Sequence, residues 1–290
     1  TLVEHDGRWH MFCSVRSRTR THQIEHISSD RLDDWSGADR ALLTCVDGYF
    51  CAPQVFYFRP HGLWYLVYQT HAEGRRLGLQ PTYSTTRDIS DPASWTAPSL
   101  FYTDDSLPTV EGWIDFWVIC DDARAHLFFT SLDGRMWRAS TELAAFPQGF
   151  GDAECVISDA HADWRLFEAS HTYRVAEDDT YLTLVEGEDR RQGVKRYFMA
   201  YAADTLAGEW SPIATTPAEP FAGELREDEL CHADDGHGDD AEADDVTDGI
   251  DGGGGDGAGG EEGFERVADQ EEAGEGAPGH GGLEGEGEGL

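Results

Sequence analysis

The sequence predicts an all-β domain, a propeller of four-stranded blades, followed by an acidic segment of different character. Three observations support this. Apolar and aromatic residues occur in short blocks that alternate or run together, without the 3.6-residue spacing of an amphipathic helix. A strand-like pattern recurs along the chain, as in repeat architectures. Past residue 223 the composition changes abruptly to Gly, Asp and Glu with scarcely an aromatic residue.

The repeat consists of an aromatic strand-like run, a second run rich in Ser and Ala, and a polar turn that closes on an aromatic residue. The closing aromatics lie roughly 50 to 65 residues apart, which is close to the length of one propeller blade. The unmatched ends indicate a fifth blade, whose strands would come from both termini. The four copies have their paired runs at 7–12 and 27–30, 62–68 and 83–86, 126–129 and 137–140, and 181–185 and 199–202, and they close on Trp35, Trp95, Phe146 and Trp210.

The net charge of −36 is spread unevenly along the chain. Residues 224–290 contain 24 acidic and 2 basic residues and so carry −22 of it. This segment cannot bury enough apolar surface to offset the entropy of ordering, so we expect it to be a disordered tail that follows a domain of residues 1–223. Such a charge disfavours nucleic acid and anionic membranes as partners, whereas a neutral polysaccharide is compatible with it.

Metal and membrane functions find little support in the sequence. None of the six cysteines belongs to a CxxC pair, which argues against a zinc site and leaves disulfides open. The acidic tail lacks the spacing of a calcium-binding loop, so we predict no metal ligands there. No apolar stretch approaches the roughly 20 residues that a membrane-spanning helix requires.

Two carboxylates stand out among the many acidic residues because of their apolar flanks. Asp115 lies within the aromatic run 113–119, and Glu168 follows Leu166 and Phe167. Burial among such neighbours raises the pKa of a carboxyl group, which suits a general acid that works near neutral pH. The alternative for each is a structural carboxylate that is hydrogen-bonded at a strand end. Glu186 has similar surroundings and is a weaker candidate.

At these residues the chain resembles glycoside hydrolase family 62. The resemblance covers roughly residues 2–223 in order, which is more specific than any single motif. Family 43, in the same clan, shares the fold and the acidic triad and is the nearest alternative. The segments that carry the resemblance are 52–58, 64–69, 113–115, 127–130, 137–140, 146–151, 166–169, 196–198 and 220–223.

The resemblance implies a five-bladed β-propeller that removes α-L-arabinofuranosyl side chains from arabinoxylan or arabinan with inversion. Glu168 matches the general acid, and Asp115 matches the third carboxylate, which tunes and orients that acid. Gln69, Arg196 and Tyr197 match positions near the sugar pocket. An inverting reaction needs an acid and a base on opposite sides of the sugar and no cofactor.

Aromatic side chains near these carboxylates are candidates for stacking on xylose rings. Trp113, directly before Ile114 and Asp115, is the candidate that we assign to substrate binding. Its alternative is an ordinary core position, which is the commoner role of an aromatic residue at strand spacing.

The sequence departs from the family pattern at both ends. The family's general base is an Asp in a Lys-Asp-Pro-like segment just ahead of the strand at 7–12, and this sequence begins at Thr1, so we expect the base to lie outside it. Asp6 is a turn residue. The family's closing strand, which contains Ser-His-Gly and offers a histidine near an axial calcium, is replaced by the acidic tail. We therefore expect a propeller that lacks its first and closing strands, and a structural calcium only in a full-length protein.

Two other functions remain open at this point. One is a family 43-like β-xylosidase or arabinanase, and the other is a non-catalytic carbohydrate-binding propeller, which the missing base would suit. The resemblance also implies a secreted monomer.

Overall fold

The computed structural model describes residues 1–16, 22–43, 48–103, 106–175, 179–191 and 193–223. These residues form strands and turns without an α-helix, which confirms the predicted all-β class. Accordingly, this part of the chain has no helix with the length and apolarity needed to cross a membrane. The predicted disordered tail, residues 224–290, lies outside the described residues.

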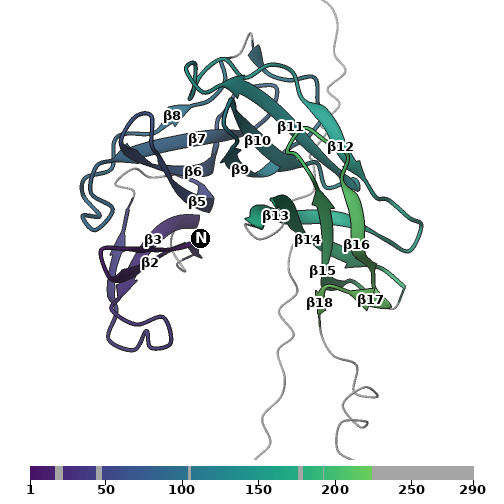
Figure 1. Ribbon diagram of the computed structural model, residues 1–290, viewed down its shortest axis with the longest axis horizontal. Coiled ribbons are helices and arrows are strands. Elements are labelled where there is room, and N and C mark those ends of the chain that lie inside the picture. Colours follow the sequence, from purple (N-terminus) through teal and green to yellow (C-terminus); the bar gives the residue numbers. More distant parts are fainter. Residues whose placement is uncertain (17–21, 44–47, 104–105, 176–178, 192, 224–290) are drawn as a thin grey trace, which may run out of the picture. The chain divides into compact units, whose positions relative to one another are not determined.

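The described strands form four antiparallel sheets, each built from consecutive segments of the chain (Figure 1). The first sheet has the order β1-β2-β3-β4, with strands Leu2–His5, Arg8–Arg16, His22–Ser29 and Asp39–Leu42. The second has the order β5-β6-β7-β8, with strands Phe50–Phe58, Leu63–His71, Leu79–Thr86 and Ser99–Leu100.

The third and fourth sheets continue the pattern. The third has the order β9-β10-β11-β12, with strands Ile114–Cys120, Arg124–Thr130, Arg135–Glu142 and Glu154–Ser158. The fourth has the order β13-β14-β15-β16-β17, and β18 pairs with β15 beside it. Its strands are Trp164–Val175, Thr180–Asp189, Lys195–Ala203, Ser211–Thr216, Glu219–Pro220 and Ala222–Gly223.

Each predicted repeat corresponds to one sheet. The two runs of every copy form its second and third strands: β2 and β3, β6 and β7, β10 and β11, and β14 and β15. Consecutive sheets pack on one another, since β2 contacts β5, β6 contacts β9, and β9 and β10 contact β13. The result is a propeller-like arrangement of four blades.

Aromatic side chains fill the space between the blades. Trp117 of β9 stacks on Phe128 of β10, with ring centroids 5.2 Å apart, and this pair belongs to the cluster shared with the fourth blade. Phe12 and Tyr68 belong to the cluster between the first and second blades. Burial of such large apolar surfaces is what holds blade to blade, and it explains why the aromatic runs recur.

The first strands of three blades share a backbone feature that positions the site. Ala52 in β5, Asp115 in β9 and Ala169 in β13 have φ values of 53°, 56° and 53°, a left-handed conformation that non-glycine residues seldom adopt. Strand pairing shifts register beside each of them, as at a β-bulge. Each of their N–H groups donates to a side chain of the preceding blade, namely to Ser14 Oγ (2.8 Å), Gln69 Oε1 (3.0 Å) and Asp115 Oδ2 (2.8 Å).

Candidate active site

Asp115 connects the third blade to the fourth. It is the second residue of β9, and its carboxylate accepts a hydrogen bond from the N–H of Ala169 at 2.8 Å. Burial raises the pKa of Asp115, and the Ala169 N–H partly offsets this because it stabilises the ionised form. The carboxylate therefore lies where the first strands of two neighbouring blades meet.

Gln69 fixes the backbone of Asp115. This buried side chain of β6 accepts the Asp115 N–H through Oε1 at 3.0 Å and donates through Nε2 to the Tyr49 hydroxyl at 3.1 Å. Both ends of the amide are thus occupied. In this structure Gln69 holds the left-handed residue in place through contacts to protein groups.

Glu168 owes its orientation to a bulge in β13. Leu166 pairs with Gly187 and Glu168 pairs with Glu186, so Phe167 and Glu168 together lie opposite a single residue of β14. Bulges of this kind bend the strand and re-aim side chains, and they are common beside active sites. The next residue, Ala169, is the one bonded to Asp115, so the aspartate also fixes the chain that carries Glu168.

The surroundings of Glu168 favour its protonated form. Burial, followed by the negative charges of Asp115 and Glu186, raises its pKa to about 7, while Arg196 acts in the opposite direction. A carboxyl group with this pKa is largely protonated in mildly acidic solution and can lose its proton near neutrality. That is the behaviour required of a general acid.

Arg196 lies between two carboxylates of β14. Its Nε is 3.3 Å from Glu186 and its Nη1 is 2.9 Å from Glu188, and its Cζ lies 3.6 Å from the centre of the Phe167 ring. The structure thus brings together four of the predicted or considered residues: Asp115, Glu168, Glu186 and Arg196.

A cavity of about 580 Å³ reaches this group at Asp115, whereas Glu168, Glu186 and Arg196 are not among its lining residues. Asp115 and Ala169 line it together with Thr1, Pro53 and His171. This volume lies in the range of pockets that bind small ligands.

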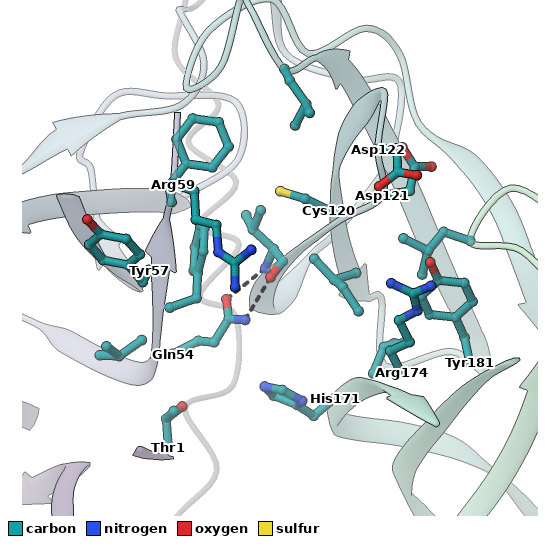
Figure 2. Close-up of a pocket in the computed structure, with 18 of the residues that line it drawn as sticks. Thr1, Gln54, Tyr57, Arg59, Cys120, Asp121, Asp122, His171, Arg174 and Tyr181 are labelled. Carbon is teal, nitrogen blue, oxygen red and sulfur yellow. Dashed lines mark hydrogen bonds between the residues drawn. The ribbon is translucent and has the colours of Figure 1, made fainter. Parts of the chain in front are cut away.

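A second cavity, of about 730 Å³, contains no residue predicted to belong to the site (Figure 2). The residues that line it include Arg59, Asp121 and Arg174, which lie at or just beyond the C-terminal ends of β5, β9 and β13. Gln54 also lines it and both donates to and accepts from the backbone of Val118, at 2.8 and 2.7 Å. The larger cavity therefore does not include the carboxylate cluster, but it shares Thr1, Gln54 and His171 with the smaller one.

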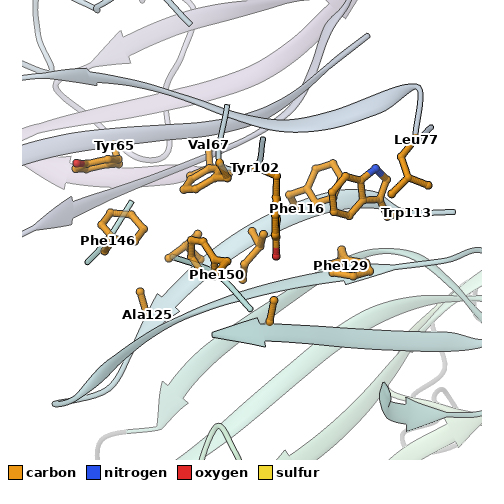
Figure 3. Close-up of a cluster of buried hydrophobic side chains, with 14 of the residues drawn as sticks. Tyr65, Val67, Leu77, Tyr102, Trp113, Phe116, Ala125, Phe129, Phe146 and Phe150 are labelled. Atoms are coloured by element: carbon orange, nitrogen blue, oxygen red, sulfur yellow. The ribbon is translucent and has the colours of Figure 1, made fainter. Parts of the chain in front are cut away.

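Trp113 and Tyr197 are placed in the core, apart from the carboxylates. Trp113 packs between the second and third blades near Phe116 and Phe129, and its indole N–H donates to the Leu79 carbonyl at 2.6 Å (Figure 3). Trp113 thus occupies the core position that was the alternative to substrate binding.

Tyr197 packs on the opposite face of β15 from Arg196. Its ring covers Gly187, where an added Cβ would lie 2.6 Å from Tyr197 Cζ, and its hydroxyl donates to the Thr215 carbonyl at 3.2 Å. Adjacent residues of a strand point to opposite faces, so only one of the two can belong to the carboxylate cluster.

The part of the chain that the structure describes contains no set of ligands for the calcium expected at the propeller axis. No group of three or more His, Cys, Asp or Glu side chains gathers there in a way that could hold a metal ion. Calcium in a full-length protein stays a prediction.

Comparison with known proteins decides the family. The profile of glycosyl hydrolase family 62 matches residues 1–253. The chain belongs to this family. Among characterised relatives, alpha-L-arabinofuranosidase C of Cellvibrio japonicus (strain Ueda107) is 36% identical over 229 residues, which cover 77% of this chain and 33% of that protein. The chain therefore spans about a third of the length of that relative.

Solved structures of family 62 proteins agree with this assignment. The catalytic domain of an alpha-L-arabinofuranosidase from Coprinopsis cinerea is 35% identical, with a TM-score of 0.66 over 77% of this chain and 69% of that one. An alpha-L-arabinofuranosidase from Podospora anserina, solved with cellotriose, is 35% identical, with a TM-score of 0.65 over 77% and 68%.

Sequence reasoning did not single out Glu188, which lies beside Arg196 in the structure. Glu186, Gly187 and Glu188 place two carboxylates on one face of β14, and Arg196 pairs with Glu188 across β14 and β15. The alternation of acidic residues around a glycine was the available signal, because side chains two apart in a strand share a face.

Proposed function

We propose that this chain is the catalytic propeller of an α-L-arabinofuranosidase that removes arabinofuranosyl side chains from arabinoxylan or arabinan with inversion. Glu168 is the proton donor, and Asp115 tunes and orients it. The observation that carries the proposal is the linkage at Ala169, whose N–H ties the strand beside Glu168 to Asp115 while the Asp115 charge raises the pKa of Glu168. Family membership supplies the reaction class.

The proposed chemistry follows from the two protonation states of Glu168. The protonated carboxyl donates its proton to the departing glycosidic oxygen, and a carboxylate on the other side of the sugar activates water. No cofactor takes part. We propose that this base is the aspartate that the family resemblance places just ahead of Thr1, because Thr1 lines the same cavity as Asp115.

The proposal extends to a fifth blade, to secretion and to the role of Arg196. The family resemblance supports a fifth blade that completes the propeller. A polysaccharide substrate supports secretion, since such a polymer is met outside the cell. Arg196 remains the candidate for contact with the substrate or with the acid, because it lies beside the carboxylates, whereas Trp113 and Tyr197 are buried in the core.

The experiment that tests the proposal is release of arabinose from wheat arabinoxylan, measured by chromatography of the free sugar. Three proteins are compared: the chain carrying a Lys-Asp-Pro segment directly ahead of Thr1, its Glu168→Gln variant, and a variant with Asn in place of the added Asp. We expect release by the first protein alone. The amide in Glu168→Gln keeps the shape of the carboxyl but cannot donate a proton.

Other outcomes would redirect the assignment. Equal release by Glu168→Gln would show that another residue is the acid. A folded protein that instead releases xylose from arabinoxylan, or fragments from arabinan in a parallel assay, would indicate family 43-like activity. Binding of arabinoxylan without any release would indicate a carbohydrate-binding propeller. The anomer of arabinose that is released first, identified by proton NMR, reports whether the anomeric configuration is inverted.

A further inference from the structure

We propose that Glu186 and Arg196 form a positioning pair that sets the protonation of Glu168, with Glu186 favouring the neutral acid, Arg196 opposing it and Glu188 holding Arg196 in place. This inference rests on the proposed role of Glu168 as the acid. It assigns to Arg196 an action through Glu168 and Glu186, in place of direct contact with the sugar.

Strand register brings these groups together. Glu168 pairs directly with Glu186 across β13 and β14, and residues that pair in this way have Cβ atoms about 4.5–5.5 Å apart. Because of the bulge, Phe167 lies opposite the same residue. Two like charges at such a separation repel, so ionisation of Glu168 becomes harder when Glu186 is ionised.

Arg196 has little freedom to leave its position. Phe167 lies 3.6 Å from its Cζ, Glu186 is 3.3 Å from its Nε, and Glu188 is 2.9 Å from its Nη1. The planar guanidinium suits both a ring face and a pair of carboxylates. The cation thus lies beside the neighbour of Glu168, where it partly cancels that neighbour's charge.

Glu188 is a firm anchor because three arginines surround it. Its side chain is only 6% exposed, and it contacts Arg190 as well as Arg196, with Arg165 at 3.8 Å. Burial alone would raise the pKa of Glu188, but the contacts with these arginines lower it. Glu188 therefore stays ionised through the working range of a carboxyl with a pKa near 7.

Glu186 responds differently. Burial raises its pKa, with Asp115 and Glu188 adding to the effect and Arg196 opposing it. The charged groups that act on the pKa of Glu168 come from three strands: Asp115 from β9, Glu186 and Glu188 from β14, and Arg196 from β15. Arg196 is the cation among them, which makes it the counterweight to three carboxylates.

The test is a direct titration of Glu168 in the 290-residue chain. Protein labelled with ¹³C at glutamate side-chain carboxyls is followed by NMR from pH 4 to 9, and the Glu168 signal is the one lost in Glu168→Gln. Glu186→Gln should lower the pKa of Glu168, and Arg196→Met should raise it, each by about half a unit or more. Combining the two substitutions should return the pKa close to that of the parent.

Matched variants separate this electrostatic role from a structural one. Arg196→Lys keeps the charge, so its pKa shift should be smaller than that of Arg196→Met. Arg196→Gln also removes the charge and serves if the methionine variant fails to fold. Arg124 and Glu142 form an exposed ion pair on the third blade, and Arg124→Met and Glu142→Gln make the same chemical changes there. These controls should leave the titration of Glu168 unchanged.

Failure of the inference and failure of the proposed function give different results. The inference would be overturned if Glu186→Gln and Arg196→Met left the pKa of Glu168 unchanged or shifted it in the same direction. A rise in KM for Arg196→Met with no change in the titration of Glu168 would also overturn it. Absence of arabinose release would contradict the proposed function alone, since the NMR titration needs no turnover. In an active protein, the basic limb of the kcat/KM profile should move in the same directions as the NMR pKa.

Discussion

Replacing Glu168 with glutamine should stabilise the folded protein at neutral and alkaline pH and have little effect in acid. The folded-state pKa of Glu168 is about 7, above the ordinary value of 4.5 that the unfolded chain would show. Between these values the folded protein binds more protons than the unfolded one, so the free energy of unfolding falls as pH rises. The contribution of the protonated group is fully present below pH 4.5 and is lost as pH passes through 7.

The size of the effect follows from the same two values. A difference of one pKa unit corresponds to 1.36 kcal/mol, so the interval from 4.5 to about 7 gives roughly 3 kcal/mol. Glu168 is only half-buried, and solvent screening reduces this to about 2 kcal/mol. Glutamine carries no charge at any pH, so the stability advantage of Glu168→Gln over the parent should grow by that amount between pH 4 and pH 8.5.

Urea unfolding followed by tryptophan fluorescence measures this difference at a series of pH values. Glu209→Gln, at an exposed position, makes the same chemical change and is the matched control. A Glu168→Gln advantage that does not change with pH would refute the reasoning, because it would mean that the carboxyl ionises as easily in the folded protein as in the unfolded chain.

The remaining predictions concern the groups around this carboxyl. Asp115→Asn removes a negative charge near Glu168, so the activity should fall and the basic limb of the pH–rate profile should move to lower pH; an unmoved limb would argue against tuning. Gln69→Leu leaves the Asp115 N–H without its acceptor and should cost about 1–3 kcal/mol in urea unfolding as well as activity. Gly187→Ala places a Cβ 2.6 Å from Tyr197 and should destabilise by about 1–3 kcal/mol, measured as a lower Tm; an unchanged Tm would mean that the ring moves freely.

The strands and the two central carboxylates could be predicted because they depend on local sequence. Each aromatic run forms the second strand of a blade, since a strand packed between two blades needs apolar side chains along most of its length. Asp115 and Glu168 were found by their apolar flanks, and burial is indeed the largest cause of the raised pKa of both. Flanking residues report burial because they are buried with the carboxyl.

The face of the strand to which a side chain points was harder to predict. Arg196 and Tyr197 are adjacent and were assigned together, yet their side chains lie on opposite faces of β15. Trp113 precedes Asp115 by two residues, but the left-handed backbone at Asp115 breaks the simple alternation of the strand. Bulges and register shifts depend on the partner strand, so the sequence of one strand does not reveal them.

The left-handed residues connect the catalytic proposal to the packing of the blades. At Ala52 and Asp115 the N–H is accepted by a neutral side chain of the preceding blade, whereas at Ala169 the acceptor is the carboxylate of Asp115 itself. The same oxygen atoms that raise the pKa of Glu168 therefore also join the third blade to the fourth. A protonated Asp115 would be a weaker acceptor for the Ala169 N–H. Loss of its charge should therefore weaken the contact between the third and fourth blades and, at the same time, lower the pKa of Glu168. Tuning of the acid and attachment of its strand are thus carried by one group and cannot vary independently.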